Sequence, residues 1–175
     1  MLSAAFIEEL GGVDAPADVD GYRARFRYCI EGVPLRGTLY LPVTVLFRRQ
    51  RARYTQDGHA QRVQLSGAVR QLTTPLLHDD RKPLARWFDS QMKYMEQEAI
   101  KLRTTPFAGL GWPDRVRKLV VVAPVAAFLY CMLVKGNLFD GRRGLMYALQ
   151  RATAEAMLSL YLVEAALRLR RTDES

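Results

Sequence analysis

The spacing of the apolar residues changes once along this chain, near Pro83, and this change limits the folds that the chain can adopt. Before Pro83, residues 22–30 alternate between apolar side chains and arginines, a period of two that is typical of a half-buried strand. After Pro83, apolar residues return every three or four positions, as on one face of a helix. Strands followed by helices predict an α+β fold and disfavour a repeating βαβ fold.

Shorter patterns complete this outline. Residues 3–10 begin with serine and predict a helix, and Ser66 and Gly67 lie between two strand-like segments and predict a β-hairpin. The apolar periodicity predicts two long helices, over residues 83–102 and 145–168. We expect Asp80 to cap the first of them. We expect a small mixed or antiparallel sheet with one helix packed on it, then a C-terminal helical hairpin. The expected regions are residues 1–103 and 104–175.

The helical period also predicts which side chains are buried. On the helix over residues 83–102 they are Leu84, Trp87, Phe88, Met92, Met95 and Ala99. On the helix over residues 145–168 they are Leu149, Ala152, Ala156, Leu160, Val163 and Leu167.

Composition narrows the class of protein. Apolar residues make up 49% of the 175 residues, which is enough for a domain with a real core. The net charge of +8 favours nucleic acid, anionic lipid or phosphorylated ligands as partners. Nucleic acid is the weakest of these, because aromatic residues do not interleave with the basic ones. Cys29 and Cys131 match no metal-ligand spacing, so we expect reduced packing residues in a cytosolic protein. Residues 1–10 lack the pattern of a signal peptide.

Residues 119–134 form an uncharged apolar run that permits two interpretations. The run is shorter than the roughly 20 residues that a simple membrane-spanning helix needs, and it contains Pro124. It is either a core helix capped by Asp114 or a helix at a membrane interface. In the second case the basic residues on its flanks would lie on anionic head groups.

Polar residues that could carry chemistry cluster between residues 48 and 80. The sequence Asp57, Gly58, His59 suits a turn at a strand end, where a carboxylate could act as general base. The alternative is a plain Asp-Gly turn with a surface histidine. His78 precedes Asp79 and Asp80, a group that could hold a divalent metal or simply cap the next helix. The arginines of residues 48–53 fit phosphate binding or a solvated strand end.

Several of these segments resemble the acceptor-side half of inverting family 2 glycosyltransferases, of the kind related to lipopolysaccharide-core sugar transferases. The resemblance covers residues 1–168 and is carried by VLFRRQRARY, by YTQDGHAQRVQLSGAVRQLTTPLLHDD and by RKPLARWFDSQMKY, which follow one another over residues 45–94. The turn NLFDGRRG, at residues 137–144, is similar to the turn between the two C-terminal helices of that family. The opening LSAAFIEEL resembles the segment that follows the Asp-x-Asp metal motif there.

The resemblance implies a partial GT-A-like fold and roles for individual residues. Catalysis would use Asp57 and His59. Substrate or phosphate binding would use Arg48, Arg49, Arg62 and His78, with His78 also a metal ligand. Membrane contact would use Arg115, Arg117, Lys118, Arg142 and Arg143.

The chain departs from the family pattern at two places. Ala60 and Gln61 follow His59 where the family often has an acidic residue. Pro83 stands where the Gln-x-x-Arg-Trp motif of processive members needs glutamine, so we interpret Arg86-Trp87 as a chance match and expect Trp87 in the core.

The nucleotide-binding strands and the Asp-x-Asp motif of the family are not among these residues, so we expect the chain alone to be inactive. Mg²⁺ or Mn²⁺, the nucleotide sugar and a glycan or lipid-linked acceptor would be bound by the intact enzyme. The expected location is the cytoplasmic side of the inner membrane. A homo-oligomer is possible, and the sequence does not decide the oligomeric state. The alternative hypothesis is a non-catalytic membrane-associated binding protein.

Overall fold

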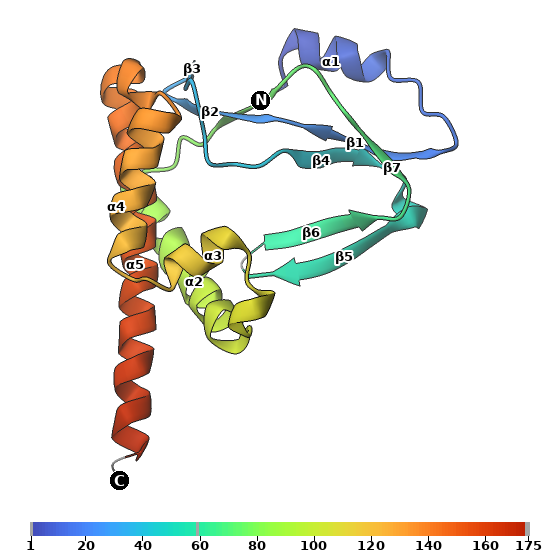
Figure 1. The fold of residues 1–175 in the computed structure, drawn as a ribbon. Helices are drawn as coiled ribbons and strands as arrows, with labels where there is room; N and C mark the ends of the chain where they lie inside the picture. Colours follow the sequence, from blue (N-terminus) through green and yellow to red (C-terminus); the bar gives the residue numbers. More distant parts are fainter. Residues whose placement is uncertain (1, 59, 174–175) are drawn as a thin grey trace. The chain divides into compact units, whose positions relative to one another are not determined.

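The chain folds into two compact units, shown in the computed structural model of Figure 1, which describes residues 2–58 and 60–173. Unit 1 comprises Met1–Gln56 and Gln61–Arg81, and unit 2 comprises Asp57–Ala60 and Lys82–Ser175. About 52% of the residues are helical and 23% lie in strands, so the predicted α+β class is confirmed. The units divide after Arg81, whereas the two regions expected from the sequence meet at residue 103.

Unit 1 contains one helix and small sheets. The helix α1 (Ala4–Gly11) begins at the predicted N-cap, where the Ser3 hydroxyl accepts a hydrogen bond of 3.2 Å from the Phe6 amide. The strands are β1 (Val19–Ala24), β2 (Phe26–Ile30), β3 (Val33–Pro34), β4 (Val43–Phe47), β5 (Ala52–Asp57), β6 (Ala60–Leu65), β7 (Ala68–Gln71) and β8 (Leu76–Asp79), with a 3-10 turn η1 (Arg49–Arg51) before β5.

The strands pair in three groups, β4-β1-β7, β3-β2-β8 and β5-β6. Strand β1 is antiparallel to β4 and parallel to β7, and β2 is antiparallel to β3 and parallel to β8. The two three-stranded sheets are therefore mixed, one of the two arrangements expected, but the strands form three groups and not one sheet. The exposure of Arg23, Arg25 and Arg27 confirms the predicted alternation. The single strand predicted over residues 22–30 is wrong, because the segment is divided into β1 and β2, which belong to different sheets. The core of unit 1 consists of Phe6, Val19, Tyr22, Ala24 and Leu72.

The hairpin predicted around Ser66 and Gly67 is wrong. Strand β6 pairs with β5, and β7 pairs with the distant β1. The reason lies in Asp20, which is only 2% exposed and whose carboxylate accepts a hydrogen bond of 2.6 Å from the Gly67 amide. A Cβ at position 67 would lie 2.6 Å from that carboxylate, so glycine serves this docking contact and not a hairpin turn.

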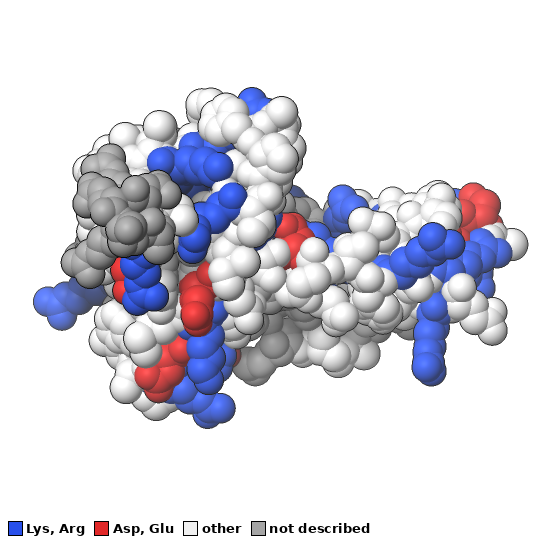
Figure 2. Space-filling model, turned by 90° about the horizontal axis from the view of Figure 1, so that it is seen from below, with Lys and Arg blue, Asp and Glu red and all other residues white. Residues whose placement is uncertain are grey.

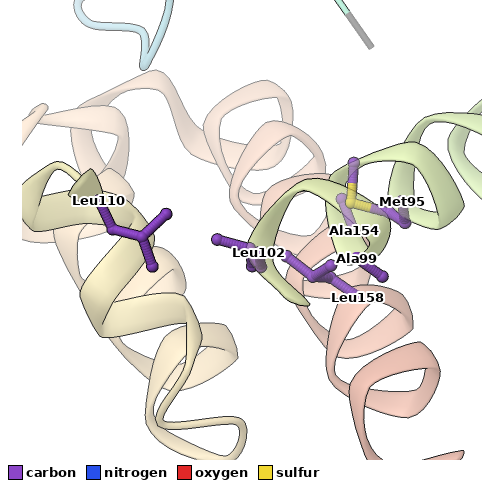
Figure 3. Packing of buried hydrophobic residues seen from close by; sticks show 6 residues of the cluster. All are labelled: Met95, Ala99, Leu102, Leu110, Ala154 and Leu158. Atoms are coloured by element: carbon purple, nitrogen blue, oxygen red, sulfur yellow. The ribbon is translucent and has the colours of Figure 1, made fainter. Parts of the chain in front are cut away.

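The described part of unit 2 from Leu84 onward is mainly helical. Its elements are α2 (Leu84–Thr104), η2 (Phe107–Gly109), α3 (Trp112–Arg117), α4 (Val122–Leu129), the π-helical turn η3 (Tyr130–Val134), the 3-10 turn η4 (Asn137–Asp140) and α5 (Gly141–Asp173). The core lies between α2 and α5, and Figure 3 shows its six buried members, Met95, Ala99, Leu102, Leu110, Ala154 and Leu158.

The helices exist as predicted, but their buried faces differ. On α2, Trp87, Met95 and Ala99 are buried as expected, whereas Leu84, Phe88 and Met92 are exposed. On α5 most of the predicted face is exposed, including Leu149, Leu160, Val163 and Leu167. The buried face of α5 instead carries Tyr147, Ala148, Ala154, Leu158 and Ala165. Small alanine side chains let the neighbouring helices approach α5 closely. The face that carries them is therefore buried, and the face with the larger apolar side chains is exposed.

Two predicted caps are also corrected. Helix α2 starts from Pro83 without a side-chain cap, so Asp80 does not cap it. The N-cap of α3 is Gly111, and Asp114 lies in the first turn of that helix. The apolar run over residues 119–134 is not one helix, because Val120 has a φ of 51° and separates α3 from α4.

Candidate functional site

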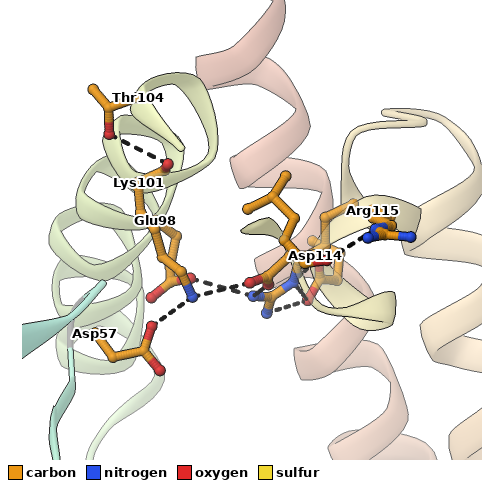
Figure 4. A network of polar contacts seen from close by, with 9 residues as sticks. Asp57, Glu98, Lys101, Thr104, Asp114 and Arg115 are labelled. Carbon is orange, nitrogen blue, oxygen red and sulfur yellow. Dashed lines mark hydrogen bonds and ion pairs between the residues drawn. The ribbon is translucent and has the colours of Figure 1, made fainter. Parts of the chain in front are cut away.

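The turn after β5 places the predicted base Asp57 beside helix α2, within unit 2. Its carboxylate lies 2.6 Å from Nζ of Lys101, and the same ammonium lies 2.9 Å from the carboxylate of Asp114 (Figure 4). Gly58 makes the turn possible. Its φ is +57°, and a Cβ there would lie 1.8 Å from Oε1 of Glu98. His59 lies outside the described residues.

A second cation, Arg117, extends this cluster into an ion-pair network. Its guanidinium donates to Glu155 at 2.8 Å, to Glu98 at 3.3 Å and to Asp114 at 3.4 Å. Burial disfavours the charged form of Arg117, but these carboxylates outweigh burial and raise its pKa. In the same way burial opposes the charge of Lys101, and Asp57 and Asp114 raise its pKa nevertheless.

The network joins four carboxylates to two cations, and Lys101 and Arg117 lie between the acidic groups. Among the described residues no group of three or more His, Cys, Asp or Glu side chains is placed to hold a metal ion. The side chain of Asp57 is 33% exposed and that of Glu98 only 4%, so Asp57 is the more accessible carboxylate. Chemically, the arrangement ties the turn to α2, α3 and α5 and keeps Asp57 in contact with a cation.

His78 lies on β8 in unit 1, opposite Tyr28 of β2. Its half-buried imidazole ring lies 5.3–6.0 Å, between ring centroids, from Tyr28, Phe26 and Tyr40. The next residue, Asp79, accepts hydrogen bonds from Arg81 at 2.7 Å and from the Gly32 amide at 3.3 Å. The Arg81 hydrogen bond lowers the pKa of Asp79. An aromatic surrounding of this kind is a poor fit to a divalent metal site.

The basic run after β4 contributes to the fold of unit 1. Arg48 donates to the carbonyls of Ala15 at 2.7 Å, Val19 at 3.1 Å and Pro16 at 3.2 Å. Arg51 binds the carboxylate of Asp20 at 2.6 Å, and this hydrogen bond lowers the pKa of Asp20. Arg48 therefore holds the loop before β1.

The other predicted phosphate-binding arginines of unit 1, Arg49 and Arg62, are exposed. Unit 1 also carries a hollow of about 300 Å³ that the sequence analysis missed. It is lined by Arg25, Phe26, Arg27, Leu35, Arg36, Gly37, Thr38 and Pro75. Figure 2 shows that Lys and Arg side chains are spread widely over the face that it draws, in line with the positive net charge.

The five cations predicted to contact a membrane fall into two groups. Arg115 donates to the Leu110 carbonyl at 2.8 Å and lies over the Phe107 ring, and Arg117 belongs to the ion-pair network, so both serve unit 2 internally. Arg142 and Arg143 are exposed in the first turn of α5.

Lys118, the fifth of these cations, lines a groove of about 580 Å³ in unit 2. Its described lining residues are Ile100, Arg103, Thr104, Lys118 and Leu169. The groove thus combines two cations with aliphatic walls, and no carboxylate is among those residues. The sequence analysis missed Arg103. The sequence carried no signal for this role, because the groove forms only where α2, Lys118 and α5 come together.

The segment after α3 exposes many large apolar side chains. Over α4, η3 and η4 the exposed members include Val121, Val122, Val125, Leu129, Leu133, Val134, Leu138 and Phe139. No helix in the described part of the chain is by itself long and apolar enough to cross a membrane. The two segments Val122–Val134 and Asn137–Leu169, bent by 76° at the break, meet the length and composition requirement only as a pair.

Comparison with known proteins gives no relatives: no protein-family model, curated protein or solved structure matches this chain. The resemblance to family 2 glycosyltransferases stays a prediction from the sequence motifs.

Proposed function

We propose that this chain is the acceptor-side part of an inverting family 2 glycosyltransferase, with a partial GT-A-like fold, and that its acceptor is a lipid-linked glycan at the cytoplasmic face of the inner membrane. The observation that carries this proposal is the groove lined by Arg103 and Lys118 together with Ile100 and Leu169. A lipid-linked glycan presents a phosphate next to a hydrocarbon chain, and the groove offers a surface for each.

The chemistry of the groove matches that acceptor on both sides. Arginine and lysine are the side chains that bind phosphate oxygens by charge-assisted hydrogen bonds. Ile100 is 54% exposed and Leu169 is 55% exposed, so the aliphatic wall is open to a ligand. Covering such side chains with a hydrocarbon chain is favourable because it removes apolar area from water.

In this proposal Asp57 takes the proton from the acceptor hydroxyl as the sugar is inverted. Its carboxylate is 33% exposed and lies 2.6 Å from Nζ of Lys101. His59 and the phosphate-binding roles of Arg49, Arg62 and His78 belong to the same proposal. The described residues do not fit a divalent metal site, so the metal and the nucleotide sugar are assigned no step here.

The second candidate function is a non-catalytic, membrane-associated binding protein. The ion pair of 2.6 Å between Asp57 and Lys101 favours it, because the contact gives this carboxylate a structural role, which is to hold the turn against α2.

Binding to three kinds of nanodisc tests the proposal: phospholipid alone, phospholipid with a polyprenyl phosphate, and phospholipid with a polyprenyl-phosphate-linked saccharide. We expect the strongest binding to the saccharide-bearing lipid. The variant Arg103→Gln/Lys118→Gln should lose that preference, and the control Lys93→Gln, on the exposed surface of α2, should keep it. Equal binding to all three nanodiscs would favour the non-catalytic function. If the chain binds neither the polyprenyl phosphate nor the polyprenyl-phosphate-linked saccharide, the proposed role of the groove is contradicted.

A further inference from the structure

We infer that the exposed apolar face of Val122–Val134 and the turn that follows it insert into the surface layer of an anionic membrane, with Lys135, Arg142 and Arg143 binding lipid phosphates at the bend. The inference deepens the proposed function by naming the surface that brings the chain to a lipid-linked acceptor. It requires only phospholipid, so it can be tested without any glycan.

The apolar face is continuous along the helical segment. Val122, Val125, Leu129 and Leu133 follow one another at intervals of three and four residues, and their exposed fractions run from 48% to 65%. This spacing places all four on one side of a helix. The buried residues of the segment, Ala123 in α4 and Cys131 in η3, are the ones that pack inside unit 2.

The turn after η3 continues the apolar face and ends it with charge. Leu138 is 53% exposed and Phe139 is 72% exposed, and both lie in η4 directly after the bend. Lys135 lies before the turn, with its ammonium 5.3 Å from the centre of the Tyr130 ring. Arg142 and Arg143 lie after the turn and are exposed. Three cations surround a turn that contains Asp140 as its only acidic residue.

The bend decides how the segment can lie in a bilayer. No single helix in the described ranges 2–58 and 60–173 is long and apolar enough to cross, and the only pair that meets the requirement is bent by 76°. A short apolar helix with basic ends is suited to the boundary between head groups and acyl chains. Apolar side chains then enter the acyl region while the cations stay among the phosphates.

Two features favour lipid over a second copy of the chain as the occupant of this face. The stripe of Val122, Val125, Leu129 and Leu133 is purely aliphatic, like the acyl chains that it would enter. The cations at the bend would repel the same cations of a second copy, but they complement anionic lipid. An exposed apolar patch with a basic border therefore matches a membrane surface better than a symmetric dimer.

Flotation of the 175-residue chain with phospholipid vesicles tests the apolar part. The wild type should float with vesicles that contain phosphatidylglycerol. Leu133→Glu should lower the partition about tenfold or more, because a charge replaces a side chain that enters the acyl region. The control is Leu41→Glu in unit 1, since Leu41 is 67% exposed and Leu133 is 65% exposed. Equal partition of the two variants would overturn the inference.

The charged part is tested by lipid composition. Arg142→Gln and Arg143→Gln should each lower binding to phosphatidylglycerol vesicles about fivefold, with little effect on the weaker binding to phosphatidylcholine vesicles. The single variants Arg23→Gln and Arg70→Gln each remove one charge from an exposed position of unit 1 and should bind like the wild type. If these controls lose as much binding, the net charge acts and not the bend, and the inference fails.

Sedimentation equilibrium without detergent tests whether a second copy of the chain binds this face. A wild type that forms a dimer, is converted to a monomer by Leu133→Glu and ignores vesicles would show that the face binds a second copy. That result would overturn the membrane inference. That result would not decide the proposed function. The nanodisc experiment tests the proposed function separately, because it measures how Arg103 and Lys118 affect the preference for the saccharide-bearing lipid.

Discussion

Glu9 fastens helix α1 to the loop after β7 through a single carboxylate. It accepts hydrogen bonds from the Thr73 amide at 2.7 Å, from the Thr73 hydroxyl at 2.8 Å and from the Thr74 amide at 2.8 Å. The Thr74 side chain and these amides favour the charged form and lower the pKa of Glu9 from 4.5 to about 2. Glu9 is thereby joined to two residues that lie 64 and 65 positions further along the chain.

This contact makes the stability of unit 1 depend on pH. Because the pKa of Glu9 is lowered in the folded state, its contribution is complete above 4.5 and is lost as the pH falls toward about 2. Glu9→Gln should therefore lower the free energy of unfolding at pH 6 and make its decline between pH 4.5 and 2 shallower. Urea unfolding at several pH values measures both. The control Glu8→Gln, on the exposed side of α1, should keep the wild-type slope.

The sequence indicated the chemical type of several residues more reliably than their contacts. The Asp-Gly turn at Asp57 was predicted, and Gly58 is needed there because of Glu98. The Lys101 partner of Asp57 lies 44 positions further along the chain, and no local pattern reports such a contact. Arg48 was interpreted as a phosphate ligand, but its guanidinium binds backbone carbonyls of the preceding loop. Spacing in a sequence shows that a side chain is charged, and only the fold shows what neutralises it.

At the scale of elements, the helices were predictable in position but not in rotation. Local periodicity located α1, α2 and α5 because caps, proline and repeated apolar residues act within a few positions. The buried face of α5 was predicted from its leucines, yet it is formed by alanines together with Tyr147 and Leu158. A helix with apolar residues on two faces does not reveal which face its neighbours cover. The predicted hairpin around Ser66 and Gly67 was wrong for a related reason. Strand β7 pairs in parallel with β1, which is far away in the sequence, and no local pattern reports such a pairing.

The ion-pair network should stabilise the packing of α2, α3 and α5. Arg117→Met removes the cation that lies 3.3 Å from Glu98, whose side chain is 4% exposed. We expect a loss of about 3 kcal/mol in the free energy of unfolding, because a buried carboxylate loses an ion-pair partner. Arg168→Met removes a surface ion pair with Glu164 and should cost about 0.5 kcal/mol or less. Chemical denaturation of both variants gives the comparison, and similar small losses would mean that the network is only a surface feature.

The first turn of α5 requires glycine at position 144. A Cβ there would lie 1.9 Å from the carbonyl oxygen of Asn137, so the backbone must move to accept alanine. Gly144→Ala should destabilise unit 2 by about 2 kcal/mol. Gly11→Ala is the matched control, because no atom lies within 4 Å of the added Cβ and alanine favours a helix. A stable Gly144→Ala protein with unchanged thermal unfolding would contradict the close approach.

At the scale of the whole molecule, the proposed acceptor and membrane surfaces lie in unit 2, and unit 1 contains the mixed sheets. The α+β class followed from the change of period near Pro83, and this class is confirmed. The groove could not be predicted, since its lining residues lie far apart in the sequence and come together only through packing.

Donor binding is expected to be weak in this chain. The resemblance assigns the diphosphate and its metal to an Asp-x-Asp motif that comes before the segment resembled by LSAAFIEEL. Asp18-Val19-Asp20 has the same spacing but follows that segment, and the Asp20 carboxylate is bound by Arg51 and by the Gly67 amide. The described residues hold no group suited to a metal ion. Titration calorimetry with UDP-sugars and GDP-sugars in the presence of Mn²⁺ should therefore show no binding in the micromolar range. Micromolar binding would place a donor site within these 175 residues.

Covalent mapping of the acceptor is the most direct test of the central claim. A polyprenyl-phosphate-linked saccharide with a diazirine near the phosphate is incorporated into nanodiscs, irradiated with the chain and located by peptide mass spectrometry. The account predicts adducts at the end of α2 and the end of α3, around Arg103 and Lys118, and their loss when unlabelled acceptor competes. Adducts confined to the strands of unit 1, or adducts that unlabelled acceptor does not reduce, would contradict it.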